Sequence, residues 1–453
     1  MIPIVTPDEM GAIDKTAPEP VEELIARAGG AVARVALEML GGTYGRRIVV
    51  LAGKGNNGND GRAAARRLRS RGVRVTMVDP MAAPDPLPIA DLVIDAAFGT
   101  GFRGSFGAPD AGGAPVLAVD IPSGVNGLTG EATDRVLTAD RTVTFAALKP
   151  GLLLAEGPDF AGEVEVVDIG LDVSSARAHL LTKADARAWL PRRDRATHKW
   201  RSAVCVVGGS PGLEGAASLT ARAALRAGAG YVRWSAPGGV PLVAKPLEAV
   251  AVDLPAHGWS DVVLADVDRF RAVTVGNGLG TDERTRTDVA ELIGRSEIPV
   301  VVDADAITLL GEEAAAVTKA TTVLTPHDSE FARLTGAAPS PDRVRSVRDA
   351  AAALGSVVLL KGPATIVASP GGDVLVSTSG DARLATLGTG DVLAGVVAAL
   401  CAGGLDPFRS AATGAFLHGW AAALGWRRGF VAGDLLELLP AALDDLVPDR
   451  VET

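Results

Sequence analysis

The feature that most constrains the fold is a series of short apolar runs, rich in Val and Ile, separated by stretches about as long as a helix. In the first part of the chain six such runs follow one another, at residues 48–51, 73–78, 92–95, 116–120, 141–145 and 164–167. An amphipathic helix is expected before them, over residues 22–40. This alternation indicates a parallel, doubly wound sheet, whose ligands bind at the carboxyl ends of the strands.

The same alternation begins again beyond Pro191 with different sequences, among them "AVCVVGGS", "AVTVGNGLG" and "SVVLLKGPATIVA". A chain of 453 residues is too long for one ordinary core. We therefore expect two α/β domains, over residues 1–175 and 176–453. No internal repeat is visible between them.

Charge and apolar patterning narrow the class of partner. A net charge of −10 argues against nucleic acid and against anionic membrane surfaces, because both require clustered Lys and Arg. The acidic N-terminus has no signal-like apolar core, and the apolar runs are too short to span a bilayer. We expect a cytoplasmic protein that binds small metabolites. Cys205 and Cys401 stand in apolar runs, which predicts buried thiols without a catalytic or disulfide role.

The stretch "LAGKGNNGNDGR" follows the first strand of the series. Its glycines form G-x-G-x-x-G, which permits backbone N–H groups to approach a phosphate at a helix N-terminus. That pattern alone is weak evidence for a dinucleotide-binding site. Its unusual part is a polar insert in place of the small residues of a dinucleotide-binding turn: Asn56, Asn57, Asn59 and Asp60. Amide and carboxylate oxygens can also hold a hard cation.

Two later strand ends carry matching chemistry. "VIDAAFGTGFRG" places Asp95 before a glycine-rich loop, and "LAVDIPSGVNG" places Asp120 and Ser123 at the end of the next strand. Any one of these aspartates can be a simple helix cap. Three successive strands that direct Asp60, Asp95 and Asp120 to one edge predict a site instead.

Together, "GKGNNGNDG", "DAAFGTGFRG", "VDIPSGVNG" and "TFAALKPGLL" resemble the signature blocks of the NAD(P)H-hydrate epimerase family over nearly all of residues 1–172. The resemblance implies a Rossmann-like domain in which Asp120 contacts the hydrated nicotinamide and is catalytic. It implies a potassium ion held by Asn57, Asp95 and Ser123. It also implies that the substrate is cradled by Asn56, Asn57, Gly58, Asn59, Asp60, Gly99, Thr100, Gly101, Phe102, Arg103, Gly104 and Ser105. Asn59 replaces a glycine of the family pattern, and Asn is tolerated there if the position requires positive φ.

In the second half, "LGTGDVLAG" combines a glycine-rich turn with a helix start. The N–H groups of residues 388–390 can form an anion hole, and Asp391 projects into the same cleft. The arrangement resembles the ribokinase-like fold, with α/β/α layers, where such an aspartate deprotonates a hydroxyl that attacks a nucleoside phosphate. The simpler reading is an acidic residue in an ordinary first turn.

Six ordered blocks, including "TVGNGLG", "VVDADAI", "LTPHDSEFARL" and "VLLKGPATIV", resemble the nucleotide-dependent NAD(P)H-hydrate dehydratases from about residue 178 onward. The resemblance implies that Ala216, Gly278 and His327 contact the hydrate and that Asp391 is catalytic. It assigns the adenine nucleotide to Lys361, Gly362, Pro363, Ala364, Thr365 and Gly390.

This half also departs from the family pattern. Asn277 stands where the family usually has Pro, and Asp328 with Ser329 replaces a common Pro-Gly pair. A structural role is the simpler interpretation for His327, and a buried Lys361 requires a phosphate or carboxylate partner.

The two resemblances together predict a bifunctional enzyme that repairs hydrated NADH and NADPH. The N-terminal domain interconverts the epimers at C6, and the C-terminal domain dehydrates the S form with ADP and Mg²⁺; ATP as donor stays open, and we expect a homo-oligomer. One alternative is a ribokinase-like small-molecule kinase with a dinucleotide-binding or scaffold N-terminal domain. An NAD-dependent oxidoreductase lacks a convincing catalytic acid or base.

Overall fold

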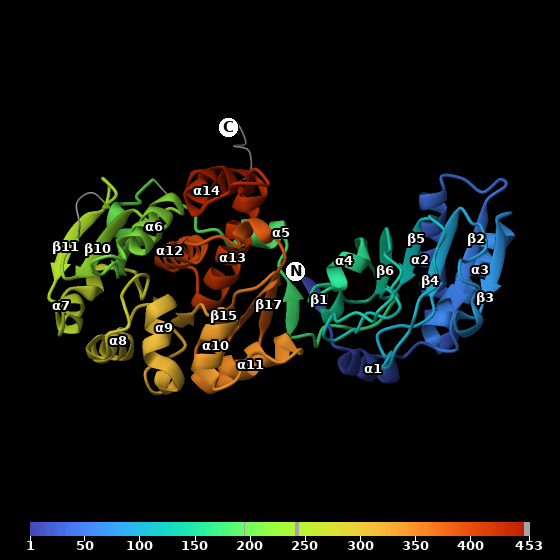
Figure 1. The fold of residues 1–453 in the computed structure, drawn as a ribbon, viewed down its shortest axis with the longest axis horizontal. Helices are drawn as coiled ribbons and strands as arrows, with labels where there is room; N and C mark the ends of the chain where they lie inside the picture. Colours follow the sequence, from blue (N-terminus) through green and yellow to red (C-terminus); the bar gives the residue numbers. More distant parts are fainter. Residues whose placement is uncertain (194, 241–243, 448–453) are drawn as a thin grey trace. The chain divides into compact units, whose positions relative to one another are not determined.

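The structure is a computed structural model that describes residues 1–453 except 194, 241–243 and 448–453 (Figure 1). Its contacts divide the chain into two compact units, Ile2–Ala178 and the part from His179 onward. Each unit is organised around a predominantly parallel sheet, which confirms the α/β fold class. No helix in the described ranges is long and apolar enough to cross a membrane.

The N-terminal sheet is parallel throughout, with strand order β3-β2-β4-β5-β6-β7. Each of the six strands lies within one residue, at each end, of a run expected from the sequence: β2 (Arg47–Ala52), β3 (Arg74–Val78), β4 (Leu92–Ala96), β5 (Val116–Val119), β6 (Arg141–Phe145) and β7 (Glu163–Val167). The chain leaves β2 in one direction to β3 and then returns past it to β4. This reversal makes the carboxyl ends of β2 and β4 the switch point where ligands bind in such sheets.

The two faces of this sheet are covered differently. Helices α2 (Val21–Leu40) and α3 (Asn56–Ser70) pack on one face. On the other face, Leu87, Phe106 and Leu137 from non-helical segments cover the strands. The intervals after β4 and β5 are long enough for helices, but their sequences "GAPDAGGAP" and "PSGVNGLTG" are rich in Pro and Gly, which break helices. The unit also contains β1 (Ile2–Ile4), α1 (Pro7–Thr16) and α4 (Gly157–Ala161).

The C-terminal sheet has the order β8-β17-β16-β15-β14-β13-β12-β9-β10-β11. It is parallel from β15 to β11, and β16 and β17 add to its edge as an antiparallel pair. Its strands are β8 (Ala178–Leu180), β9 (Ala203–Val207), β10 (Tyr231–Pro237), β11 (Val250–Leu254), β12 (Ala272–Val275), β13 (Val300–Val302), β14 (Thr322–Leu324), β15 (Val357–Leu360), β16 (Thr365–Ala368) and β17 (Val374–Ser377).

Helices lie on both faces of this sheet, as the expected α/β/α layering requires (Figure 1). One side carries α6 (Glu214–Arg226), α12 (Thr389–Ala402), α13 (Pro407–Ala423) and α14 (Ala432–Leu446). The other carries α8 (Glu283–Arg295), α9 (Ala304–Leu310), α10 (Asp328–Thr335) and α11 (Arg343–Leu354). The remaining helices are α5 (Lys183–Trp189) and α7 (Ser260–Leu264). Cys205 and Cys401 are buried free thiols, as expected.

Candidate active sites

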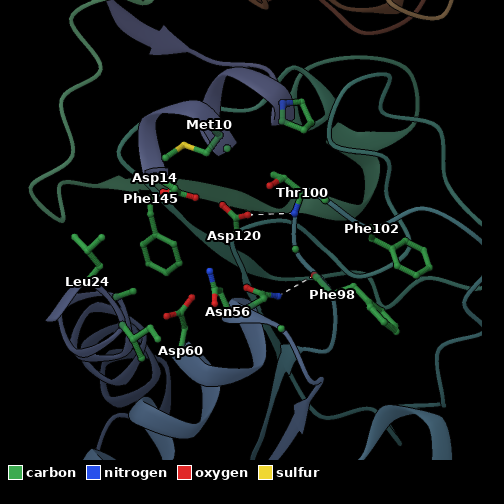
Figure 2. Close-up of a pocket in the computed structure, with 18 of the residues that line it drawn as sticks. Met10, Asp14, Leu24, Asn56, Asp60, Phe98, Thr100, Phe102, Asp120 and Phe145 are labelled. Atoms are coloured by element: carbon green, nitrogen blue, oxygen red, sulfur yellow. Dashed lines mark hydrogen bonds between the residues drawn. The ribbon is translucent and has the colours of Figure 1, made fainter. Parts of the chain in front are cut away.

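A cavity of about 710 Å³ opens at the carboxyl ends of β2 and β4, where the sheet order predicts a ligand (Figure 2). Apolar side chains of α1 and α2, among them Met10 and Leu24, close one side of it. Nine of the residues assigned to the N-terminal site line this cavity: Asn56, Asn57, Asp60, Gly99, Thr100, Gly101, Phe102, Arg103 and Asp120. The structure therefore brings together the loops after three strands, as the aspartate pattern indicated.

The other four residues assigned to the substrate cradle, Gly58, Asn59, Gly104 and Ser105, lie outside the lining, as do Asp95 and Ser123, which were assigned to potassium. A Cβ on Gly58 would stand 1.9 Å from the carbonyl oxygen of Gly53, so Gly58 allows the helix to start directly above the loop. Asn59 lies in the first turn of α3 without positive φ, and its Oδ1 accepts a hydrogen bond from Arg62 at 3.2 Å. The idea that this position requires positive φ is wrong. Gly104 and Ser105 are exposed on the loop beyond the cavity.

The N-terminus of α3 faces the cavity, and within the described residues its first backbone N–H groups form no hydrogen bond. Gly55 is the N-cap and has no side chain to cap the helix, and the first turn contains no acidic residue. The first helical bond runs from Asn59 N to Gly55 O at 3.1 Å. The N–H groups before it are therefore free to bind an anion such as a phosphate.

Asp120 is held in an unusual conformation beside a buried lysine. Its φ is +70°, in the left-handed region that non-glycine residues rarely adopt. Its Oδ1 lies 2.6 Å from Nζ of Lys149, whose side chain is only 1% exposed, and also accepts from Thr144 Oγ1 at 3.1 Å. Its Oδ2 accepts from the N–H of Thr100 at 3.3 Å. Lys149 was not among the predicted site residues, although it lies in the quoted block "TFAALKPGLL".

Two more carboxyl groups line the same cavity, Asp14 from α1 and Asp60 from α3 (Figure 2). Burial raises the pKa of Asp60 to about 8, and the negative charges of Asp120 and Asp14 add to the shift. Burial also raises the pKa of Asp14, which the nearby Lys149 opposes. Near neutral pH the cavity thus contains a protonated carboxyl group, Asp60, and a carboxylate paired with an ammonium, Asp120.

The three residues assigned to potassium are linked by hydrogen bonds, with Asn57 in the cavity lining and the buried Asp95 and Ser123 outside it. Ser123 donates to Asp95 from Oγ at 2.6 Å and from its N–H at 2.8 Å. The amide of Asn57 donates to the carbonyl of Phe98 at 2.8 Å, and the same Phe98 bonds with Ser123. Asn57 Oδ1 is buried without a hydrogen-bond partner. Amide, carboxylate and hydroxyl oxygens are the kinds of donor that a hard cation prefers.

In the C-terminal unit, Asp391 lies in the first turn of α12. Gly388 caps this helix with φ +90°, and Val392 is the first residue to bond back to it, from its N–H to Gly388 O. Asp391 Oδ1 accepts a hydrogen bond from Asn277 Nδ2 at 2.8 Å. Burial raises the pKa of Asp391 to about 6. This carboxyl group is therefore poised to accept a proton near neutral pH.

Behind Asp391 runs a chain of paired groups from the neighbouring strand ends. Asn277 also donates to Asp303 Oδ2 at 2.9 Å, and Asp303 Oδ1 lies 2.9 Å from Nζ of Lys361. Lys361 is also 3.5 Å from buried Glu330, so this lysine has the carboxylate partners that its burial requires. Asp303 and Glu330 were not singled out from the sequence. Asp303 directly follows β13, the signal used for Asp95 and Asp120, whereas Glu330 lies in the first turn of α10, six residues after β14 ends.

The other residues assigned to the C-terminal site fall in two groups. A Cβ on Gly278 would approach Cβ of Ala216 to 3.2 Å, so these two hydrate-contact candidates are neighbours. Gly390 lies close to Nζ of Lys361, which begins the turn between β15 and β16. That turn contains the remaining nucleotide candidates, of which two are exposed, one is buried and one begins β16: Gly362, Pro363, Ala364 and Thr365.

His327 has a clear structural function. Its Nδ1 accepts from the N–H groups of Ser329 and Glu330, so the imidazole caps α10. The other ring nitrogen, Nε2, lies 3.5 Å from Oε1 of Glu330, and the His327 side chain is half-exposed. Asp328, the extra carboxylate at this turn, forms a bidentate ion pair with Arg343, with N–O distances of 2.6 and 3.0 Å. Its charge is thus neutralised.

One buried histidine near Asp391 was assigned no role from the sequence. His418 on α13 approaches the carbonyl oxygen of Thr389 to 2.8 Å, so Nε2 carries the proton. Burial lowers the pKa of His418 to about 4, which keeps it neutral. It supports the first turn of α12 from behind.

Comparisons with known proteins find relatives of both units. Residues 204–442, more than half of the chain, match the family model described as NAD(P)H-hydrate dehydratase. Residues 21–88 and 78–151 match the model of the YjeF-related protein N-terminus. A bifunctional NAD(P)H-hydrate repair enzyme of Moorella thermoacetica is 37% identical over 99% of this chain and 98% of its own. The chain belongs to the bifunctional NAD(P)H-hydrate repair enzymes.

Further members of the repair enzyme family show similar agreement. The enzyme of Mycobacterium leprae is 37% identical over 88% of this chain and 89% of its own. Among solved structures, the ADP/ATP-dependent NAD(P)H-hydrate dehydratase of Bacillus subtilis, co-crystallized with ATP and Mg²⁺, covers 58% of this chain with 29% identity. Its TM-score is 0.53, and 97% of that chain is covered. A ribokinase-like protein of Enterococcus faecalis, at 24% identity and TM-score 0.53, shares the fold.

Proposed function

We propose that this repair enzyme restores hydrated NADH and NADPH in two steps, with epimerisation at C6 in the N-terminal unit and nucleotide-dependent dehydration of the S hydrate in the C-terminal unit. Family membership supports both activities. The observation that carries the proposal is that each unit places an aspartate beside free N–H groups of a helix N-terminus, at the carboxyl edge of its own sheet.

For dehydration, hydroxide is a poor leaving group and must be activated. The C6 hydroxyl oxygen attacks the terminal phosphorus of the nucleotide, its proton passes to Asp391, and the shortened nucleotide leaves. The lone pair of the ring nitrogen then expels phosphate from C6, and loss of a ring proton restores the dihydronicotinamide. The N–H groups at the start of α12 and the ammonium of Lys361 would stabilise the transferred charge.

For epimerisation, the N-terminal cavity offers both members of an acid and base pair. Asp60, protonated near neutral pH, can give a proton to the leaving hydroxyl of the hydrate, and the Asp120 carboxylate can receive one when water returns to the opposite face. Lys149 would fix the orientation of Asp120. The free N–H groups of α3 and the loop at Gly99 to Arg103 would bind the phosphates of the dinucleotide.

Two metal ions complete the proposal. Asn57, Asp95 and Ser123 would hold K⁺, and the unpartnered Oδ1 of Asn57 supports this assignment. The ion would supply fixed positive charge next to the phosphate-binding loop. In the C-terminal unit Mg²⁺ would bind the nucleotide phosphates together with the buried carboxylate of Glu330, and would neutralise phosphate charge. We propose ADP as the donor, in a cytoplasmic homo-oligomer.

The test supplies the protein with both hydrate epimers, K⁺, Mg²⁺ and either ADP or ATP. We expect the near-ultraviolet absorbance of the reduced dinucleotide to return, with both epimers consumed and ADP the better donor. Asp120→Ala should consume only the S epimer, after correction for spontaneous exchange. A stable phosphorylated product without recovered absorbance would contradict the proposal and favour a small-molecule kinase.

A further inference from the structure

Asn277 occupies the centre of the polar network in the C-terminal unit. It follows β12, and only 1% of its surface is exposed. Its Nδ2 donates one hydrogen bond to Asp391 at 2.8 Å and another to Asp303 at 2.9 Å. Ionised carboxylates only accept hydrogen bonds, so the amide must present its NH₂ group to both. Its Oδ1 is left facing Thr274 Oγ1 at 3.4 Å.

We propose that Asn277 is a positioning residue for dehydration, which aims the carboxylate of Asp391 at the substrate hydroxyl and extends the reaction to lower pH. The inference rests on the proposed dehydratase function and deepens it. The Pro expected at this position from the family pattern has no donor that could take this role.

Burial raises the pKa of Asp391 most, and neighbouring charged and neutral groups add to or oppose this shift. Asp303 and Asp305, from the segment after β13, raise the pKa of Asp391, and Lys361, from the end of β15, lowers it. The hydrogen bond from Asn277 also lowers this pKa. His418, which lies behind Thr389, is neutral.

The position of Asn277 between two carboxylates makes its loss consequential. Lys361 is already engaged by Asp303 at 2.9 Å and by Glu330 at 3.5 Å. Without the amide, Asp391 and Asp303 would face each other with no donor between them. Protonation of Asp391 would relieve that repulsion, so its pKa would rise.

The direction of the effect on rate follows from the role of Asp391. As a general base it works in its ionised form, so dehydration slows as the pH falls through its pKa. A variant without the donor has a higher pKa, and the acid limb of its pH profile moves up by about one unit. At pH values on this acid limb, the kcat/KM of the variant is therefore about tenfold lower than that of the wild type.

The chain offers a well-matched pair of variants, Asn277→Ala and Asn277→Pro. Within the described residues, the backbone N–H of Asn277 donates no hydrogen bond, so Pro removes the side-chain donor without breaking a backbone bond. Neither variant changes the preceding residue, Gly276, whose φ of +122° is a conformation that only glycine adopts readily. Asn277→Ala provides the second variant if the Pro variant folds poorly.

The experiment measures kcat/KM for nucleotide-dependent dehydration against pH for the full-length wild type and both variants. At pH values above both acid limbs, the variants should reach the kcat/KM of the wild type, which shows that the C-terminal unit of each variant has folded. We expect the acid limb of both variants to lie about one pH unit above that of the wild type, with the KM for nucleotide changed less than about twofold. Titration of the substrates themselves is common to all three proteins.

Two outcomes would overturn the inference. If active, folded variants have the same acid limb as the wild type, Asn277 does not influence Asp391, although the dehydratase function stands. If the wild type shows no nucleotide-dependent recovery of reduced dinucleotide, the proposed function fails and the inference fails with it.

Discussion

The two candidate sites both use an aspartate near the carboxyl edge of a parallel sheet, but they hold it on different elements and surround it differently. Asp120, at the end of β5, is paired with the buried ammonium of Lys149 at 2.6 Å and has left-handed backbone. Asp391, at the start of α12, is held by the neutral amide of Asn277. The nearest lysine described for this network, Lys361, is paired with Asp303. A full charge adjoins one aspartate, and a dipole adjoins the other.

This difference corresponds to what each reaction requires. Reversible epimerisation needs a proton donor and an acceptor in one cavity, and the N-terminal site has Asp60 with a pKa of about 8 near an ion-paired Asp120. Phosphoryl transfer needs an acceptor alone, and Asp391, with a pKa of about 6, can exchange its proton with solvent after each cycle. The surroundings, more than the aspartate itself, separate the two chemistries.

The largest effect is expected from Asp391→Asn. The amide cannot accept the hydroxyl proton, so nucleotide-dependent dehydration should fall by about 10²- to 10⁴-fold. Because burial opposes the charge of Asp391, the neutral variant should be at least as stable as the wild type.

Measured in the same samples, epimer exchange should be unchanged, because its machinery lies in the other unit. A variant that kept more than a tenth of the dehydratase rate, as followed by absorbance of the reduced dinucleotide, would remove Asp391 from the base role.

The next largest effect is expected from Lys149→Met in the N-terminal site. Breaking a buried pair by removing one partner costs about 3 to 5 kcal/mol of stability, because the Asp120 charge loses its partner in a buried setting. Epimer exchange should fall about a hundredfold as Asp120 loses its fixed orientation. Hydrogen exchange of peptides from β5 and β6 would locate the loss of stability.

A double-mutant cycle separates the ion pair from simple packing. The double variant combines Asp120→Asn with Lys149→Met. It should regain most of the stability that the single variant Lys149→Met loses, since no unpaired charge remains. Exposed Lys54, at the rim of the same cavity, gives the stability control, and Lys54→Met should change stability by less than about 0.5 kcal/mol. Equal losses in the single and double variants would show that Lys149 contributes packing alone.

A smaller effect distinguishes the two sites by pH. Asp60 donates only while protonated, so epimer exchange should decline as the pH rises through its pKa of about 8. Asp60→Asn should lose this alkaline limb and run about tenfold slower at neutral pH. Dehydration should show no matching limb at that pH.

Stability gives an independent check on Asp60. Its pKa is higher in the folded protein than in the unfolded chain, so the folded form holds a proton that the unfolded form releases above about pH 4. The contribution is complete below that pH and is lost as the pH rises towards about 8. Asp60→Asn should therefore remove part of the loss of stability between about pH 4 and pH 8. If the rate of epimer exchange by the wild type did not decline as the pH rose through about 8, Asp60 would not be the proton donor.

Much of this organisation was predictable from the sequence, because it depends on local patterns. The six strands of the first sheet follow from Val- and Ile-rich runs, and the strand ends identified Asp60, Asp95 and Asp120. Lys149 was missed because its importance arises from a contact across 29 residues, which no spacing rule encodes. Asn277 was noted only as a departure from a pattern, since its bonds to Asp303 and Asp391 join two separate strand ends and the start of a distant helix.

Asn59 shows the opposite failure, because its replacement of a family glycine suggested a position with positive φ that the structure does not have. It lies in the first turn of α3, without positive φ, and its side chain bonds to Arg62 on the same helix. Asn59→Gly should lower stability by about 0.5 to 1 kcal/mol, because glycine gains chain entropy on unfolding and the side-chain bond is lost. Epimer exchange should stay within about twofold, because Asn59 does not line the cavity. A larger rise in the rate of the Gly variant would mean that the Asn59 side chain obstructs the substrate, and would return this position to the site.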